Sequence, residues 1–287
     1  MGTALQFDAP AGQARDTTQW LWLQRLAAPT PPLSALIVAA HPGDEVIGAG
    51  ARLAHLRNRV LIVHVTDGAP GDLENAGFAP TPEDADARRR ELHAALGLAG
   101  IGTESTLSLG VPDTRAAFTL VLLVRALATL VAAMQPDIVL THPFEGGHPD
   151  HDATAYAVQR AMKAARRLGA APVLVEFTSY HAGAGGLEPG FLPTPRPVPA
   201  ITVPLDRRER ALKDAMLGCF ASGAETPQAF GGDEERFRIA PAYDFRARPH
   251  DGRLWYEARW GVPWPTWSRL VEEADVAIAS EPENRCG

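Results

Sequence analysis

The chain has 287 residues, of which 46% are hydrophobic, and this is enough apolar material to form one large domain. Its formal net charge of -7 at pH 7 excludes the broad basic surface with which proteins neutralise nucleic-acid phosphates. The first thirty residues contain no apolar segment of signal-peptide length, so the expected location is the cytoplasm.

Short apolar segments alternate with helical patterns along the first two thirds of the chain. The expected strands are 33–40, 61–65, 106–109, 137–140 and 172–177. The expected helices are 46–59, a segment opened by a capping pattern at residue 81, 116–134, and a segment from residue 150. This alternation predicts an α/β fold, a Rossmann-like parallel sheet with helices on both faces.

Segment 116–134 is apolar enough to suggest a membrane span, but Arg125 lies near its middle. A charge at mid-bilayer is costly, so we expect a buried helix and no membrane span.

The later part of the chain is less regular. A Gly- and Pro-rich stretch ends near residue 199, and a strand at 200–203 and a helix at 206–220 follow. We therefore expect a single domain, 1–287, with a core at about 33–220 and an irregular C-terminal extension, 221–287, packed on that core. The sequence leaves the oligomeric state open, a homo-oligomer included.

Two turns that follow predicted strands combine histidine with carboxylate: HPGDE at 41–45 and HPDH at 148–151. If the strand order reverses beside the first strand, the first and fourth strands are neighbours and the two turns face each other. Each turn alone could simply cap the helix that follows it. Together, the ligand types His, Asp and His, with room for water, predict an open catalytic zinc site, one per chain. Two histidines and one carboxylate also suit iron, so another divalent metal stays open.

The segments AAHPGDEVIGAG (39–50) and EGGHPDHDAT (145–154) resemble the two signature segments of the PIG-L/LmbE-like deacetylases. These are zinc enzymes that hydrolyse N-acetylglucosaminyl and related N-acyl groups. VTDGAPGD (65–72) and LGVPD (109–113) also lie where that family has similar segments. The resemblance covers roughly residues 33–220.

The resemblance implies a role for each residue of the site. The implied metal ligands are His41, Asp44 and His151. The implied catalytic groups are His148, which assists at the tetrahedral intermediate, and Asp150, which orients it. An imidazole held by Asp150 is expected to stay protonated and to stabilise an oxyanion. The implied substrate-binding residues are Arg88 and Asp113.

The chain departs from the family at Gly43, where the usual sequence HPDDE has the aspartate that acts as general base. Proton transfer by such a base contributes roughly 10²–10⁴-fold to the rate. Three explanations remain open: another carboxylate substitutes, the chain is weakly active or inactive, or glycine accommodates a bulky ligand. The candidate substitute bases are Glu145, Asp67 and Asp113. Glycine could also serve only to allow a positive φ.

The predicted function is therefore zinc-dependent removal of an acyl group, acetyl above all, from an N-acylated amino sugar or glycoconjugate precursor. The rival hypothesis is a degenerate, non-catalytic relative that binds metal and ligand, and Gly43 is the feature in its favour. A nucleotide-binding Rossmann protein is disfavoured, because VIGAG (46–50) lacks the spacing of a phosphate-binding loop.

Overall fold

The computed structural model describes residues 6–8, 17–28, 33–69, 81–183, 186–194, 196–221 and 232–280. The strands are β1 Gln6–Asp8, β2 Ala35–Ala39, β3 Val60–Thr66, β4 Thr106–Val111, β5 Ile138–Thr141, β6 Val173–Phe177, β7 Tyr180–Gly183, β8 Gly186–Pro189, β9 Ala200–Pro204 and β10 Glu234–Ile239. The α-helices are α1 Thr17–Ala27, α2 Asp44–Leu56, α3 Pro82–Leu98, α4 Leu120–Met134, α5 Pro149–Arg167, α6 Arg207–Leu217, α7 Trp255–Arg259 and α8 Trp264–Ala279.

Eight strands form one mixed sheet in the order β1-β9-β10-β6-β5-β2-β3-β4, and β7 and β8 form a separate hairpin. Strands β4, β3, β2, β5 and β6 run parallel to one another, whereas β10 is antiparallel to both β6 and β9. The expected parallel sheet is confirmed for the five strands that build the centre and one edge. The expected pairing of the first and fourth predicted strands is also confirmed, because Val38 of β2 pairs with Thr141 of β5.

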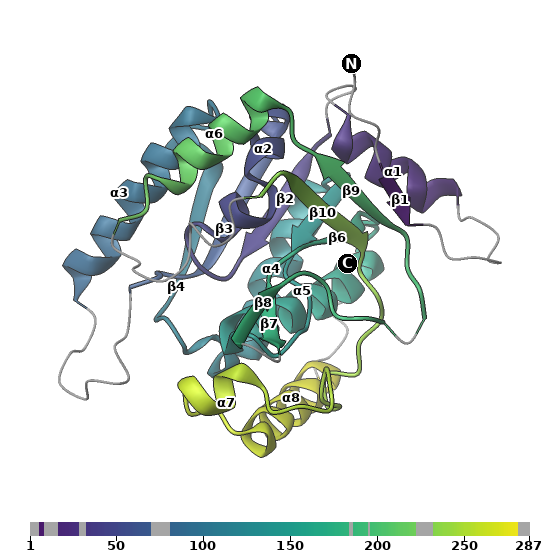
Figure 1. Ribbon diagram of the computed structural model, residues 1–287. Coiled ribbons are helices and arrows are strands. Elements are labelled where there is room, and N and C mark those ends of the chain that lie inside the picture. The colour runs from purple at the N-terminus through teal and green to yellow at the C-terminus, as the bar shows by residue number, and fades with distance from the viewer. Residues whose placement is uncertain are drawn as a thin grey trace.

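Helices cover both faces of the sheet, as Figure 1 shows. One core cluster joins α1, α2, α3 and α6 to alternate sheet residues such as Ile37, and the other joins α4, α5 and α8 to residues such as Leu36. Neighbouring side chains of a strand point to opposite faces. Both sets are buried, which is why the central strands read as continuous apolar runs.

The capping pattern at residue 81 is confirmed. Thr81 accepts a hydrogen bond from the Asp84 backbone, Asp84 bonds back to Thr81, and Pro82 occupies the first turn of α3. The apolar segment Ala116–Met134 is long and apolar enough to cross a membrane, by length and composition alone. In the structure Leu123 and Leu127 of this segment lie in the same core cluster as α5 and α8.

The prediction of an irregular C-terminal extension was wrong. Strand β10 lies inside the sheet between β9 and β6, and Trp267 of α8 is fully buried in the core. Residues 222–231 and 281–287 of the predicted extension lie outside the described part of the chain, as do residues 70–80 of the turn after β3.

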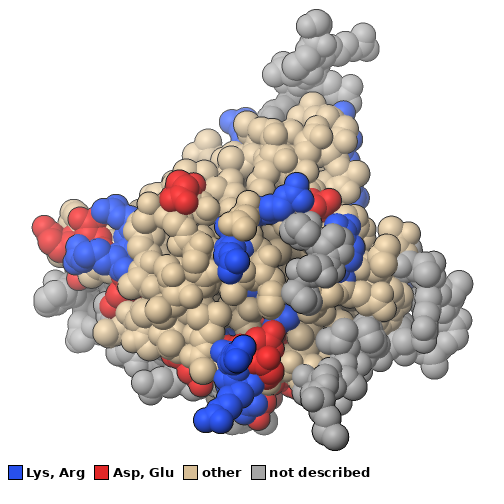
Figure 2. Space-filling view, turned by 90° about the horizontal axis from the view of Figure 1, so that it is seen from above, with Lys and Arg blue, Asp and Glu red and all other residues tan. Residues whose placement is uncertain are grey.

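On the face seen in Figure 2, Lys and Arg side chains form small separate groups, several of them beside Asp or Glu. That face shows no broad basic field, as the net charge of -7 predicts.

Candidate functional site

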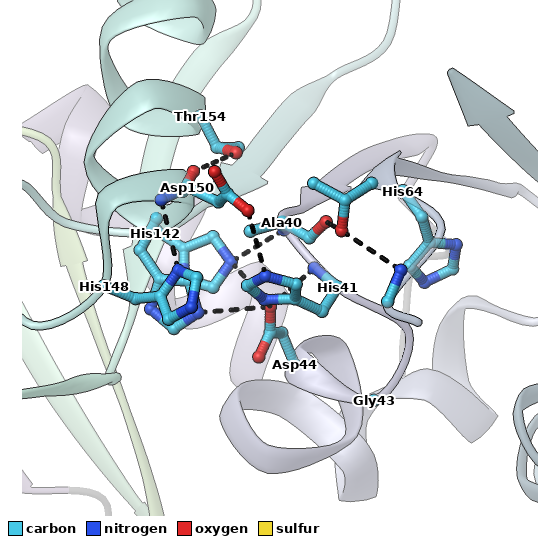
Figure 3. Close-up of polar contacts among 12 residues, drawn as sticks. Ala40, His41, Gly43, Asp44, His64, His142, His148, Asp150 and Thr154 are labelled. Carbon is cyan, nitrogen blue, oxygen red and sulfur yellow. Dashed lines mark hydrogen bonds and ion pairs between the residues drawn. The ribbon is translucent and has the colours of Figure 1, made fainter. Parts of the chain in front are cut away.

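The two histidine turns meet at the carboxyl ends of β2 and β5, and α5 begins within the second of them (Figure 3). Asp44 Oδ2 lies 3.2 Å from His41 Nδ1 and 3.4 Å from His151 Nε2. Ligands held about 2.0–2.1 Å from a tetrahedral metal are separated from one another by about 3.3 Å. Asp44 therefore lies beside both predicted histidine ligands. Among the described residues, three groups of side chains have ligand atoms within 4.8 Å of one another: His41-His148-His151, Asp44-His142-His151 and His41-Asp113-His148-Asp150.

The second ring nitrogen of each histidine, the one that faces away from Asp44, contacts side-chain oxygens. His41 Nε2 lies 3.0 Å from Asp113 Oδ1 and 3.3 Å from Asp150 Oδ2, and His151 Nδ1 lies 3.0 Å from Ser179 Oγ. Ligating histidines in proteins usually bond a carboxylate or another oxygen through the second ring nitrogen. His151 Nε2 is buried and has no hydrogen-bond partner within the described residues. This donor set fits a bound metal.

The charges around the site are unequal. Burial lowers the pKa of His41, but the carboxylates of Asp113, Asp150 and Asp44 outweigh it and raise that pKa well above its ordinary value. Burial raises the pKa of Asp44, yet His151 and His142 hold it well below its usual range. Burial and His142 lower the pKa of His151 to about 3. Asp44 is thus ionised and His151 neutral at pH 7, the forms that bind metal, whereas the raised pKa of His41 means that this ring must lose a proton before it can bind one.

His148 and Asp150 contact each other differently from the expectation. The Asp150 backbone N–H donates to His148 Nδ1 at 3.1 Å, so His148 caps α5. The Asp150 carboxylate lies instead against His41 and accepts the backbone N–H groups of Thr114 and Ala116. Burial, followed by His41, lowers the pKa of His148 well below its ordinary value. The structure favours neutral His148, not the readily protonated imidazole that was expected.

The two predicted substrate-binding residues have different neighbours. Asp113 follows β4, and its Oδ1 lies 3.0 Å from His41 Nε2. Arg88 of α3 bonds Glu91 at 3.5 Å, and its guanidinium lies 5.7 Å from the centre of the Phe220 ring. Its guanidinium Nε is buried without a hydrogen-bond partner in the described part of the chain.

Gly43 has a φ of 110° at the start of α2, a conformation that side chains strongly disfavour. A Cβ placed there would lie 3.2 Å from Phe220 Cε1. The backbone explanation for this glycine, one of those left open by the sequence, is therefore supported by the structure.

The three candidate substitute bases lie in different places. Asp113 has a carboxylate oxygen within 4.8 Å of ring nitrogens of His41 and His148. Glu145 accepts the Leu192 backbone N–H and lies 3.8 Å from Arg238, and burial raises its pKa to about 8. Asp67 accepts the Ala69 backbone N–H in the turn after β3.

Three residues join the site that the sequence did not assign to it. His142 stacks on His151 with ring centroids 4.0 Å apart. Tyr180 of β7 lies 5.1 Å from the His151 ring, and Trp260, just after α7, lies 4.3 Å from the His148 ring. His142 follows β5 directly, so the rule that strand ends carry functional groups could have found it. No periodic signal pointed to Trp260.

The chain is similar in sequence to known deacetylases. Residues 36–162 match the model of the PIG-L family, described as GlcNAc-PI de-N-acetylase. A 1D-myo-inositol 2-acetamido-2-deoxy-alpha-D-glucopyranoside deacetylase 2 of Catenulispora acidiphila is 31% identical over 176 residues, covering 53% of this chain and 58% of the relative. A protein of the same description from Saccharopolyspora erythraea is 29% identical over 221 residues, covering 62% of this chain and 78% of the relative. The chain thus spans little more than half of the Catenulispora protein.

Solved structures share the fold. The A40926 pseudoaglycone deacetylase Dbv21 superposes with a TM-score of 0.54 at 23% identity, covering 74% of this chain and all of that protein. A triple mutant of a deacetylase from the teicoplanin biosynthetic pathway superposes with a TM-score of 0.56 at 21% identity, covering 73% of this chain and 98% of that protein.

Proposed function

We propose that this protein, whose residues 36–162 match the model of the PIG-L family, is a metal-dependent deacetylase that removes the acetyl group from the nitrogen of an N-acetylglucosamine-containing glycoconjugate. The observation that carries the proposal is that Asp44 Oδ2 lies 3.2 Å from His41 Nδ1 and 3.4 Å from His151 Nε2, while His151 Nε2 is buried without a hydrogen-bond partner in the described chain. We propose zinc, one ion per chain, as the metal. When bound, such an ion polarises the amide carbonyl and lowers the pKa of a water molecule to about 7.

His148 is assigned the part of hydrogen-bond donor. Its Nδ1 accepts the Asp150 backbone N–H, so in the neutral ring the proton resides on Nε2. We infer that this N–H stabilises the negative oxygen that develops when water attacks the carbonyl carbon. As the C–N bond breaks, the proton that the attacking water has released to a carboxylate passes to the leaving amine, and His148 keeps its own proton.

Asp113 is assigned the part of proton acceptor in place of the family aspartate. Of the three candidate carboxylates, it is the one with an oxygen within 4.8 Å of His148 and His41 ring nitrogens. Burial raises its pKa, but His41 outweighs burial and keeps the pKa below its ordinary value, so Asp113 is ionised at neutral pH. An ionised carboxylate beside the reacting centre can accept the proton that the attacking water releases.

Aromatic side chains and Arg88 supply the proposed contacts to the sugar. Trp260 and Tyr180 contact the rings of His148 and His151 from two separate segments. Aromatic faces suit the apolar side of a sugar ring, and a guanidinium suits its hydroxyl groups. The names of the Catenulispora and Saccharopolyspora relatives make a glucosaminyl-inositol the substrate class to test first.

The test is acetate release from N-acetyl-D-glucosamine and from 1D-myo-inositol 2-acetamido-2-deoxy-alpha-D-glucopyranoside, with the free amine measured in parallel. We expect equal amounts of acetate and amine with at least one of these compounds. His148→Ala should lower the rate by about 10²-fold or more while metal content is unchanged. If the protein binds metal and sugar but releases no acetate, the non-catalytic binding protein is the better hypothesis. If His148→Ala turns over substrate as fast as wild type, His148 has no part in the mechanism.

A further inference from the structure

His142 lies at the end of β5 and is only 1% exposed. Its ring is nearly parallel to that of His151, with an interplanar angle of 19°, and its other neighbour is the edge of Phe177 at 4.9 Å. Figure 3 shows the contact of His142 with Ala40, the residue before His41. Two aromatic rings therefore fix the orientation of His142, and one of them belongs to a proposed metal ligand.

The hydrogen bonds of His142 fix its tautomer. The Ala40 backbone N–H donates to Nε2 at 3.0 Å, so the proton of the neutral ring is on Nδ1. Nε2 also lies 3.3 Å from Asp44 Oδ2, at ion-pair distance. One nitrogen of His142 thus contacts both the backbone before His41 and the carboxylate of Asp44.

A histidine lone pair lies in the plane of its ring, and the rings of His142 and His151 are nearly parallel, with centroids 4.0 Å apart. Their lone pairs therefore lie in separate planes, and the face of His142 supports the ring of His151. Asp44, His142 and His151 also offer ligand atoms within 4.8 Å of one another, so His142 as a further ligand is the alternative to a supporting role.

We propose that His142 is a positioning residue that presets the metal centre before the metal binds. It does so through two contacts: its ring face supports His151, and its Nε2 anchors Ala40, the residue before the ligand His41. The inference rests on the proposed metal site, and it assigns a part to a residue outside the His, Asp, His ligand set. Groups that orient metal ligands typically change metal affinity by about 10–100-fold when they are replaced.

Two substitutions separate the two contacts. His142→Phe keeps an aromatic face against His151 but removes the acceptor for Ala40, whereas His142→Gln keeps an acceptor at the same reach and removes the ring. His55→Gln is the matched control, because His55 lies at the far end of α2, where its nearest charged partner is Glu209. The probe is the metal alone: zinc affinity of the metal-free protein by competition with a chelator, and the visible absorption spectrum of the cobalt-loaded protein.

We expect each His142 variant to bind zinc about 10–100-fold more weakly than wild type, with the cobalt spectrum unchanged because the ligands stay the same. His55→Gln should bind like wild type. Wild-type affinity in both His142 variants would overturn the inference and leave the proposed function standing. A changed cobalt spectrum would make His142 a ligand and overturn its positioning role. No metal binding by wild type would overturn the inference and the proposed metal site together. If one variant fails to fold, the other still decides between these outcomes.

Discussion

Gly43 shows how a single residue links backbone geometry to chemistry. At φ 110° an aspartate side chain would be strained, and its Cβ would lie 3.2 Å from Phe220 Cε1 and Cζ. The ring of Phe220, just after α6, therefore crowds the space that the Cβ of an aspartate at position 43 would need.

Gly43→Asp tests whether the missing aspartate can simply be restored. We expect this variant to lose ~1–3 kcal/mol of unfolding free energy from backbone strain and to gain no acetate release, measured by urea unfolding and a coupled acetate assay. Gly43→Ala is the control, since it adds the same Cβ without a carboxylate. Full stability together with faster turnover in Gly43→Asp would show that the loop accepts a base and that the base limits the rate.

Asp113→Asn distinguishes a proton acceptor from a group that only holds His41. If Asp113 accepts the proton, the variant should keep its metal and lose about 10²–10⁴-fold in kcat. The readouts are metal content and steady-state kinetics. Loss of metal in proportion to activity would reduce Asp113 to orienting His41, the ligand that it contacts at 3.0 Å.

Single residues also show what the sequence could predict. His41, Asp44 and His151 could be placed together because the order of strands alone brings their turns side by side. The state of His148 could not be predicted, because its pKa depends on burial and on two neighbouring histidines. The contact between the Asp150 carboxylate and His41 depends equally on side-chain geometry that no spacing encodes.

At the scale of elements, a buried polar network ties the segment after β8 to the sheet. Arg238 of β10 donates to Glu176 of β6 at 2.7 Å and to the Leu192 carbonyl at 2.9 Å. Glu145 accepts the Leu192 N–H at 3.0 Å, so two charged side chains hold one residue of that segment. Burial raises the pKa of Glu145 from 4.5 to about 8.

The raised pKa of Glu145 predicts a pH-dependent stability. The folded protein holds this proton more tightly than the unfolded chain, so unfolding free energy falls as pH rises from 4.5 to about 8. Glu145→Gln cannot ionise and so avoids this loss. The difference in unfolding free energy between Glu145→Gln and wild type should therefore grow by at most ~1.4 kcal/mol for each pH unit of increase. Urea unfolding at pH 5, 6.5 and 8 measures this difference. An advantage that does not change with pH would contradict the prediction, and loss of turnover with metal retained would make Glu145 the base.

Helix α7 and the residue after it bring the C-terminal region to the site. The backbone N–H of Trp255 donates to the Gly146 carbonyl at 2.9 Å, and the ring of Trp260 contacts the ring of His148. We expect Trp260→Ala to raise KM about 10-fold, a loss of ~1.4 kcal/mol, with kcat and metal content little changed. Trp264→Phe, which alters a tryptophan beneath Arg248, is the control. Unchanged KM in Trp260→Ala would place Trp260 outside the substrate site.

Two elements escaped prediction for a physical reason. The sequence of β10, EERFRI, has four charged residues and therefore suggests an exposed segment. Glu235 and Arg238 are nevertheless buried, because Lys213 pairs with Glu235 and Glu176 pairs with Arg238. Composition does not reveal such pairing. Helix α8 begins with the residues Trp264-Pro265, and its pattern lacked the clear period that identifies a helix.

At the scale of the whole molecule, the sheet order determines where the chemistry lies. Strands β2 and β5 are adjacent although about a hundred residues separate them, and the turns that follow them carry the proposed ligands. Helix α2 can pack closely on β6 because Gly48 has no side chain, and a Cβ there would lie 2.2 Å from Phe177. The C-terminal third adds β10 to this sheet and places the ring of Trp260 against His148.

The metal content of the purified chain, wild type against Asp44→Ala, tests the central claim most directly. Asp44 Oδ2 lies within 3.4 Å of both proposed histidine ligands, so its loss should abolish binding while the fold survives. We predict about one zinc per wild-type chain and almost none in Asp44→Ala. A wild-type chain without any divalent metal, or equal metal in both proteins, would contradict the proposed site.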